Sequence, residues 1–330
     1  MTKGYQAAKH TPNLPNSPRI TMGPMAASFI FGYFHTNTYL LQMRKISLAA
    51  FILLFSFFCS QAQKTDRTLQ SRVEDLIKGF HGDVGIYIYS PEKNRTVAIN
   101  ADTVFPTASI VKISILIGIM AKMQSGELDY HQRMTYTDSL FYDEGDDLLS
   151  RFKPGSEIEL SKLIMLMLTI SDNCASLWLQ GLAGGGVRIN QLLDSLGIVN
   201  TRVNSRTPGR ETARQNYGWG QTTPREIAGI MERIVKGEIF NKEASARMLR
   251  LLSRQYWDEQ ALSQIPAGVF TADKNGAVDQ SRNEVVYVNG KHPYFFSIFT
   301  KNNADSSWKP DNEAWVLTKK LSAMLWDYYK

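Results

Sequence analysis

Apolar residues recur with a helical period near both ends of the chain. Within each end they lie three or four positions apart, at Leu69, Val73, Leu76, Ile77 and Phe80, and again at Leu317, Leu321, Met324, Leu325 and Tyr328. This period predicts two amphipathic helices, the first of which stops around Gly79 and Gly82. Each helix then needs an apolar surface to cover.

Strand-like runs supply that surface. β-branched and aromatic residues cluster in short segments bounded by turn residues, at 84–89, 96–100, 269–273, 284–288 and 294–300. Asn289-Gly290, between the last two, is a strong hairpin signal. The predicted fold class is α/β in the α+β sense, with one antiparallel sheet built from both chain ends and flanked by the terminal helices.

The middle of the chain, from about residue 109 to 260, has the pattern of helices joined by loops. Residues 160–170 form the most apolar of these helices. We therefore predict a sheet domain made of residues 63–106 and 260–330, with an all-helical domain, residues 107–259, inserted between its two parts.

The first 62 residues form a leader of different composition. Met43-Arg44-Lys45 precedes an apolar run, residues 46–58, and Ser60-Gln61-Ala62 has the small residues of a cleavage site. This order is typical of a secretory signal peptide, and the run is too short to span a bilayer comfortably. We expect translation to start at Met43, residues 1–42 to be an upstream over-extension, and a periplasmic protein without a stable membrane span. Lipid attachment at Cys59 is the alternative, although no small residue precedes it.

Charge changes the picture only in the leader. The chain carries a net +6, but residues 1–62 hold five Lys and Arg and no Asp or Glu, and subtracting five from six leaves +1 for residues 63–330. The pI near 9.1 therefore belongs to the leader and does not indicate nucleic-acid binding. Cys174 alone remains after cleavage, so no intrachain disulfide can form.

Candidate chemistry begins with Ser109 and Lys112. They are three residues apart, so at the opening of a helix the amine can reach the hydroxyl. Unpaired N–H groups at such a helix start would also stabilise an oxyanion formed on an acyl group. The pair alone is weak evidence, because a serine N-cap followed by an ordinary lysine is the commoner explanation.

Two later triplets lie at predicted element boundaries. Ser171-Asp172-Asn173 follows the most apolar helix, and Lys274-Asn275-Gly276 ends the predicted strand 269–273. Helix caps and turns explain the first triplet alone, and a solvated edge lysine explains the second. The three motifs together, in this order and each on the expected element, are far less expected by chance.

With these motifs the sequence resembles the penicillin-recognising serine enzymes, and most closely the class A β-lactamases, whose motifs are Ser-x-x-Lys, Ser-Asp-Asn and Lys-Thr-Gly. The resemblance covers nearly all of residues 65–330 and includes Gly184-Gly185, Leu196-Gly197, Thr201-Arg202 and the run 222–226. It implies the β-lactamase/transpeptidase-like fold, which agrees with the periodicities. It also implies hydrolysis of β-lactam amides through a Ser109 acyl-enzyme, with no cofactor and no metal.

The resemblance assigns roles to the acylation residues. Ser109 would be the nucleophile and Lys112 its base or proton relay. Ser171 would pass a proton to the leaving nitrogen, and Asn173 would hold Lys112 and the substrate amide. Two lysines near one site disfavour each other's protonation, and burial adds to this effect, so Lys112 could be neutral enough to accept a proton.

The third motif would bind the substrate. The resemblance implies that Lys274 faces the substrate carboxylate and that the N–H groups of Ser109 and Ala277 form the oxyanion hole. Gly276, the last residue of the third motif, is expected to be part of the same substrate-binding strand. Asn275 departs from the family pattern, because a hydroxyl residue is usual there. The hydrogen bond to the substrate carboxylate is then altered in geometry, although an amide can still donate.

The loop between Thr201-Arg202 and Thr223-Pro224 departs further. Class A enzymes carry a glutamate there, followed by an asparagine, and the two position the water that releases the acyl group. If the loop has the same length here, these places fall on Thr207 and Glu211, and the place of the family's loop arginine falls on Ser205. Glu211 then either serves as the base from a neighbouring position or forms a salt bridge with Arg206, Arg210 or Arg214.

Other site types fit less well. The sequence has no Gly-x-Ser-x-Gly elbow, and His81, His131 and His292 lack metal-ligand spacing. We expect a monomer acting on a small β-lactam or peptidoglycan-like substrate. Three functions stay open: a class A β-lactamase-like hydrolase first, then a related serine hydrolase or D-Ala-D-Ala peptidase with little lactamase activity, then an acylating β-lactam sensor.

Overall fold

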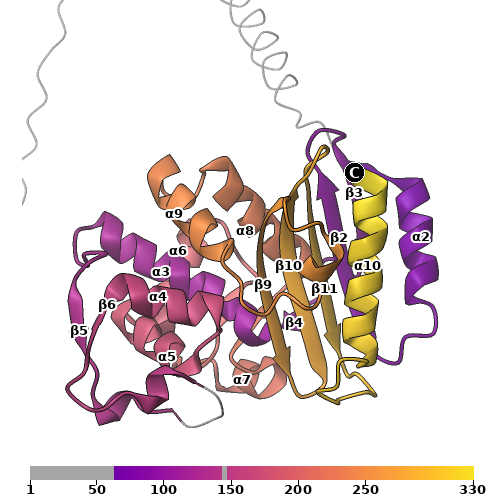
Figure 1. Cartoon of the computed structure of the whole chain (residues 1–330). Helices are drawn as coiled ribbons and strands as arrows, with labels where there is room; N and C mark the ends of the chain where they lie inside the picture. Colours follow the sequence, from indigo (N-terminus) through magenta and orange to yellow (C-terminus); the bar gives the residue numbers. More distant parts are fainter. Residues whose placement is uncertain (1–62, 143–146) are drawn as a thin grey trace, which may run out of the picture. The chain divides into compact units, whose positions relative to one another are not determined.

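Strands from both ends of the chain form the main sheet, in the order β1-β3-β2-β11-β10-β9 (Figure 1). A computed structural model describes residues 63–142 and 147–330. The first three strands are β1 (Lys64–Thr65), β2 (Asp83–Ser90) and β3 (Arg95–Ile99), and the last three are β9 (Phe270–Val278), β10 (Ser281–Asn289) and β11 (Tyr294–Lys301). β2 and β11 pair antiparallel, with Ile86 opposite Ile298, which confirms a sheet built from both chain ends.

Two details of the sheet differ from the sequence-based prediction. The two-residue strand β1 runs parallel to β3, so the sheet is mixed and not purely antiparallel. β9 continues five residues past its predicted end at Asp273 because Lys274–Val278 pair with β10. The third motif is therefore part of a strand. The hairpin between β10 and β11 exists, with residues 290–293 as its connection.

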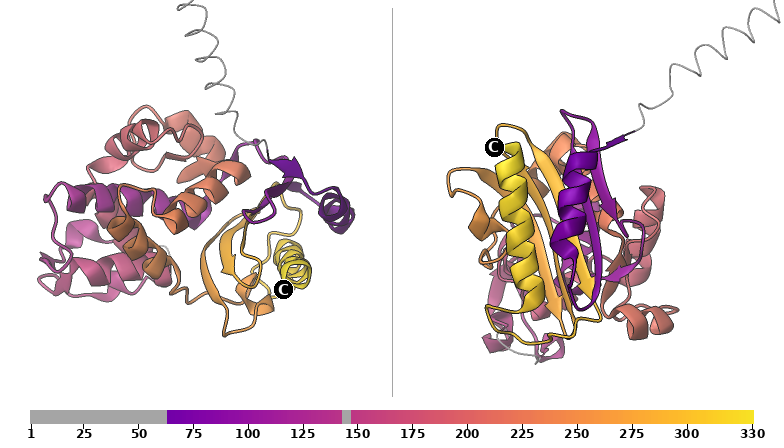
Figure 2. Two further views of the ribbon diagram at one scale, coloured as in Figure 1. Left: turned by 90° about the horizontal axis from the view of Figure 1, so that it is seen from above. Right: turned by 90° about the vertical axis from the view of Figure 1, so that its right-hand side faces the viewer.

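The terminal helices cover one face of the sheet. Helix α2 (Arg67–Ile77) and helix α10 (Glu313–Tyr329) lie beside each other on that face (Figures 1 and 2). Their buried residues pack against alternate sheet positions in one cluster that includes Leu69, Val73, Leu321, Leu325, Ile86, Ile88 and Val286. Fully burying such a side chain contributes about 1.5–3 kcal/mol, so this contact accounts for the two periodic patterns at the chain ends.

Helices from the middle of the chain lie on the other side of the sheet. They are α3 (Lys112–Gln124), α4 (Leu160–Thr169), α5 (Asn173–Leu182), α6 (Gly185–Ser195), α7 (Glu211–Tyr217), α8 (Pro224–Lys236) and α9 (Lys242–Leu252). The region is mainly helical, as predicted, and short strands also join its loops: β5 (Arg133–Thr135), β6 (Glu157–Glu159), β7 (Arg202–Val203) and β8 (Gly220–Thr222). A further short strand, β4 (Phe105–Pro106), lies just before this region and pairs with β8. The pairs of β8 with β4 and β7 satisfy backbone groups in loops that are at least partly buried.

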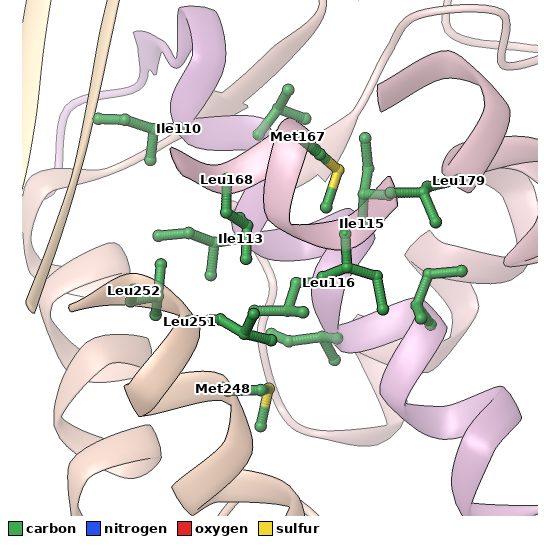
Figure 3. Packing of buried hydrophobic residues seen from close by; sticks show 14 of the residues in the cluster. Ile110, Ile113, Ile115, Leu116, Met167, Leu168, Leu179, Met248, Leu251 and Leu252 are labelled. Carbon is green, nitrogen blue, oxygen red and sulfur yellow. The ribbon is translucent and has the colours of Figure 1, made fainter. Parts of the chain in front are cut away.

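Helix α3 is the centre of this second core. Its residues from Lys112 to Met120 are all buried, because α4, α5, α6 and α9 pack around it. Figure 3 shows Ile113, Ile115 and Leu116 of α3 among side chains of the neighbouring helices. A helix that is apolar on all sides belongs in such a position. The fold thereby fixes Lys112 at the first turn of its most enclosed helix.

Residues 63–330 form one compact unit. In the described part of the chain no helix combines the length and apolar character needed to cross a bilayer. The predicted signal peptide at 43–62, the start at Met43 and the lipid site at Cys59 lie outside the described residues. The predicted domain boundaries at residues 106 and 260 stay predictions.

Candidate active site

Ser109 lies in a short 3-10 helix, η1 (Ala108–Val111), that leads directly into α3. The predicted position at the opening of a helix is confirmed, and the first turn of that opening is a 3-10 turn. Ala108 has a φ of 45°, a left-handed value that is uncommon for a residue with a side chain. Thr107 N–H donates to the carbonyl of Gly220 on β8 at 2.9 Å. The turn is thus anchored on both sides, and it holds the Ser109 hydroxyl in place.

Lys112 gathers the polar side chains of the site. Its Nζ lies 3.1 Å from Ser109 Oγ, 3.0 Å from Ser171 Oγ and 2.9 Å from Asn173 Oδ1, and it also contacts the Ser171 carbonyl. The structure therefore brings together the first two motifs. Two of the four partners are hydroxyls, which accept from an ammonium and can instead donate to the lone pair of a neutral amine.

The environment of Lys112 favours that neutral amine. Burial lowers the pKa of Lys112 well below its usual 10.5, and the positive charge of Lys274 lowers it further. The carboxylates of Asp147 and Asp172 act in the opposite direction. Because the side chain is fully buried, burial is the dominant cause. An amine that has lost its proton can accept the proton of Ser109 as its hydroxyl attacks a carbonyl.

Ser171 adopts a strained backbone conformation. Its φ is 64°, in the left-handed region that costs a residue with a side chain about 1–2 kcal/mol. The neighbouring Asp172 is the N-cap of α5 and accepts a hydrogen bond from Ala175 N–H at 2.7 Å. Its second carboxylate oxygen accepts from Leu149 N–H at 2.9 Å. These two bonds hold the turn that aims the Ser171 hydroxyl at Lys112.

Asn173 is fixed from its backbone as well as its side chain. Its N–H donates to the carboxylate of Asp147 at 2.7 Å, while its side-chain oxygen faces Lys112. Asp147 is a site residue that the sequence analysis missed. No local pattern identifies it, because the contact spans 26 positions and joins a residue just before η3 (Leu149–Arg151) to the first residue of α5.

β9 brings the third motif against the nucleophile. A Cβ on Gly276 would lie 2.6 Å from the Thr107 carbonyl oxygen and 2.8 Å from Ser109 N. Only glycine permits this approach, so its place in the motif has a steric reason. Asn283 on β10 donates to the Pro106 carbonyl at 2.8 Å and ties the same strands to the turn. Asn283 is a second positioning residue that the sequence analysis missed.

Lys274 and Asn275 lie next to this approach. Lys274 is fully buried, and its Nζ donates to the carbonyl of Asn275 at 2.9 Å and to the Asn275 side-chain oxygen at 3.2 Å. The amide nitrogen of Asn275 donates to the Trp257 carbonyl at 2.9 Å. One hydrogen of that amide is therefore engaged with the protein. The expected role of Asn275 toward a substrate carboxylate depends on the other hydrogen.

A cavity of about 560 Å³ opens beside these residues. Its lining includes Ser109, Ser171 and residues 275–277, together with Trp257, Glu284 and Trp308. Ala277, the second predicted oxyanion donor, therefore lines the same cavity as the nucleophile. The volume is in the range that holds a drug-sized ligand. A carbonyl compound bound here can reach Ser109.

Glu211 makes a different contact from either of those predicted. It is exposed at the start of α7, and its carboxylate accepts a hydrogen bond from Gly209 N–H at 3.0 Å. Within the described residues it forms no ion pair with Arg206, Arg210 or Arg214 and no hydrogen bond to the Lys112 cluster. Its predicted role in releasing the acyl group stays a prediction.

Neutral hydrogen bonds hold Ser205 and Thr207 of this loop. Ser205 is buried and donates to the side chain of Gln180 at 2.8 Å, while the Gln180 amide donates to the Ser205 carbonyl. Thr207 is also buried and donates to the same carbonyl at 2.9 Å. Ser205 and Thr207 thus occupy the positions where an arginine and a glutamate are expected in class A enzymes. Both hydroxyls donate hydrogen bonds to neighbouring groups of the protein.

The described residues contain no group of three or more His, Cys, Asp and Glu side chains arranged to hold a metal ion. The groups that line the site are its own side chains and backbone. Those are a hydroxyl, a buried amine, a second hydroxyl and a strand edge, which together suit attack on an amide or ester carbonyl.

Known proteins are similar in sequence to this chain. The family described as the beta-lactamase enzyme family matches residues 68–329. Beta-lactamase VEB-1 of Pseudomonas aeruginosa is 21% identical over 300 residues, which cover 87% of this chain and 98% of the relative. A beta-lactamase of Streptomyces fradiae is 25% identical over 252 residues, covering 74% and 81%.

Solved structures show the same fold. PBP-A superposes with a TM-score of 0.71 at 24% identity, covering 81% of this chain and 97% of PBP-A. A mutant of PBP-A, solved as an acyl-enzyme complex with penicillin G, gives a TM-score of 0.72 at 23% identity, covering 82% and 99%. The β-lactamase/transpeptidase-like fold and the match over most of the chain lead to one conclusion. The chain belongs to the class A β-lactamase family.

Proposed function

We propose that this protein is a serine hydrolase that opens β-lactam amides through a Ser109 acyl-enzyme and releases the acyl group slowly. The observation that carries the proposal is the contact of the buried Lys112 amine with Ser109 Oγ at 3.1 Å. In this mechanism the amine takes the Ser109 proton as Oγ attacks the carbonyl. Ser171, which touches the same amine at 3.0 Å, then gives its proton to the leaving nitrogen and takes one back from the Lys112 ammonium, so that the amine is neutral again.

The slow second step follows from the loop. Hydrolysis of an acyl-enzyme needs a base that activates water. Thr207 is a buried hydroxyl engaged with the Ser205 carbonyl, and the Glu211 carboxylate is exposed and engaged with Gly209 N–H. Lys112 is the remaining group beside the acyl position that can accept a proton. We therefore expect acylation to be faster than release.

Intact-mass measurement after mixing with penicillin G tests both steps. The purified protein should gain one covalent adduct that persists for many minutes, and the Ser109→Ala variant should gain none. An unmodified protein, shown to be folded by circular dichroism, would overturn the proposal. Rapid consumption of penicillin without an accumulating adduct would disprove slow release and support an efficient β-lactamase.

Glu211→Gln addresses the loop directly. If Glu211 has no part in release, the lifetime of the adduct should not change, because the glutamine still reaches Gly209. If the lifetime increases at least about tenfold, which corresponds to 1.4 kcal/mol in the barrier, Glu211 is the base and our assignment of slow release to this loop fails.

A second candidate is a D-Ala-D-Ala peptidase with little lactamase activity. The similarity to PBP-A and the uncharged side chains of Ser205 and Thr207 favour it. A diacylated Lys-D-Ala-D-Ala peptide separates the two. Release of D-alanine by the parent protein, and not by Ser109→Ala, would support the peptidase. A lasting penicillin adduct without either activity would instead indicate an acylating sensor.

We also propose that the protein is exported to the periplasm. The support is the signal-peptide pattern of residues 43–62. Peptide mass mapping of the protein recovered from its native cells should give a mature N-terminus at Gln63. An N-terminus near residue 1, or a lipid on Cys59, would contradict this export route.

A further inference from the structure

Trp308 is a large apolar side chain left open beside the candidate active site. It is 64% exposed, and it lines the cavity that also contains Ser109. Trp257, which is 42% exposed, lines the same cavity, and Pro310 and Trp315 add to the lining. An exposed aromatic ring in a cavity next to a reactive group indicates a place where part of a ligand binds.

The loop that carries Trp308 is firmly held. The carbonyl of Ser307 accepts hydrogen bonds from Arg282 Nη2 and from Asn312 Nδ2, each at 3.0 Å. Arg282 also donates to the Ser306 carbonyl at 3.2 Å. The backbone that leads into Trp308 is therefore fixed, and little conformational entropy is lost when a ligand binds to its ring.

Arg282 covers one face of the Trp308 ring. Its guanidinium carbon lies 4.5 Å from the ring centroid of Trp308 and 4.9 Å from that of Trp315, and the two ring centroids are 5.9 Å apart. These three distances form a nearly equilateral triangle, so Arg282 and Trp315 lie on the same side of the Trp308 ring. Because more than half of Trp308 is exposed, its second face is open.

The strand register places this ring near Asn275. Arg282 of β10 is opposite Ala277 of β9, and Glu284 is opposite Asn275. Opposite residues share a face of the sheet, and side chains two positions apart share it too, about 7 Å along the strand. Arg282 and Asn275 therefore project from the same face. The resemblance places the substrate carboxylate at Lys274 and Asn275, so a group bound on Trp308 belongs to the carboxylate side of the substrate.

The guanidinium on one face of the ring selects the kind of group that binds on the other. A cation draws π electron density toward itself, so the open face of Trp308 is less negative than that of a free indole. A second cation is then attracted only weakly, whereas an electron-rich aromatic ring can stack there. The cavity of about 560 Å³ has room for such a substituent beyond the reacting group.

We propose that Trp308 forms an aromatic subsite, which binds a planar, electron-rich ring carried on the carboxylate side of the substrate. Trp308 touches the substrate in this role, and Arg282 is a positioning residue that orients the indole and withdraws electron density from it. The place of the ring on the substrate rests on the proposed function. The affinity of Trp308 for an aromatic ring does not.

Small carboxylates test the subsite without any acylation chemistry. 4-Methoxyphenylacetate and 4-methoxycyclohexylacetate carry the same charge, but only the first has a flat aromatic ring. The indole N–H signal of Trp308, identified in NMR spectra by its loss in Trp308→Phe, reports binding to the purified protein. The aromatic compound should bind about three- to tenfold more tightly, the usual contribution of one aromatic pair. 4-Nitrophenylacetate, whose ring is electron-poor, should bind more weakly than the methoxy compound.

These titrations have clear contrary results. Equal affinities for the aromatic and the saturated compound, or a Trp308 signal that no compound moves, would overturn the subsite. Tighter binding of the nitro compound would overturn the assignment of an electron-rich ring. A Trp308 signal that moves with protein concentration alone would show that a second copy of the chain covers the ring, and the proposal would fail.

Two cephalosporins with methyl or benzyl at C3, the carbon next to the one that bears the carboxylate, test the subsite during acylation. The ratio of their acylation rate constants, benzyl to methyl, should be about three- to tenfold higher in the parent protein than in Trp308→Leu. Comparing ratios cancels the intrinsic reactivity of the two compounds. Trp308→Phe should keep most of the preference, because it keeps an aromatic ring.

Phe270→Leu is the matched control for this comparison. Phe270 is 43% exposed at the start of β9 and lies outside the cavity lining, so this variant should keep the parent ratio. A parent ratio that persists in Trp308→Leu would overturn the role of Trp308 toward the substrate. If none of these proteins is acylated, the proposed function fails, while the carboxylate titrations still decide whether Trp308 binds aromatic rings.

Discussion

Asp172 is the residue whose removal tests how the site is held together. Its carboxylate is 1% exposed, caps α5 through Ala175 N–H at 2.7 Å and accepts from Leu149 N–H at 2.9 Å. Asp172→Ala removes the cap, which costs about 0.5–2 kcal/mol. It also leaves the buried Leu149 N–H without a partner, at about 1–3 kcal/mol. We expect a loss of about 2–4 kcal/mol in the free energy of unfolding.

The same change should slow acylation. Ser171 and Asn173 flank Asp172, and both contact Lys112. Once the cap is lost, the left-handed turn at Ser171 is free to relax. A misplacement of about 1 Å in a catalytic group typically costs on the order of a hundredfold in rate. Urea unfolding gives the stability, and the rate of labelling by a fluorescent penicillin gives the acylation rate.

Asn241→Ala is the matched control. Asn241 caps α9 by accepting from Ala244 N–H at 2.8 Å, and it is exposed. Its loss should cost about 1 kcal/mol and leave acylation unchanged. If Asp172→Ala is no more destabilising than Asn241→Ala, or if it is acylated at the parent rate, the reasoning that this carboxylate fixes the site is refuted.

Three further predictions follow from particular positions. Ser171→Gly should be more stable than Ser171→Ala by about 1 kcal/mol, since glycine tolerates a φ of 64°. Both variants should lose acylation, and equal unfolding midpoints would show that the turn stores no strain. Gly186→Ala should lower the free energy of unfolding by about 1–3 kcal/mol, because a Cβ at this position would lie 1.8 Å from Thr207 Oγ1. Its control is Gly181→Ala in α5, where a Cβ would have no atom within 4 Å, and which should leave thermal stability unchanged or raise it. The free energy of unfolding should decline as pH rises from about 5 to 7, because folded Asp273 and Glu284 keep protons that the unfolded chain releases. Urea unfolding of the Asp273→Asn/Glu284→Gln variant at several pH values should no longer show this decline, and an unchanged decline would assign it to other groups.

Local sequence pattern was sufficient to predict the two terminal helices and the contact between Ser109 and Lys112. The periodic residues of α2 and α10 face one core because an amphipathic helix has only one way to bury its apolar stripe. Ser109 and Lys112 are three residues apart, so local geometry alone places their side chains within reach. Asp172 was identifiable as a helix cap for the same reason, since capping depends on the next three residues.

The sequence by itself therefore determined the two terminal helices, five strands of the main sheet, the family motifs and the Ser109–Lys112 pair, all of which depend on residues close together in the chain. Only the tertiary structure decided that Asp147 holds Asn173, that Glu211 turns to Gly209, and that Glu284 lies buried near Asp273. Such contacts join distant segments, and their charge states depend on burial. Burial is a property of the folded surroundings, which no short stretch of sequence contains.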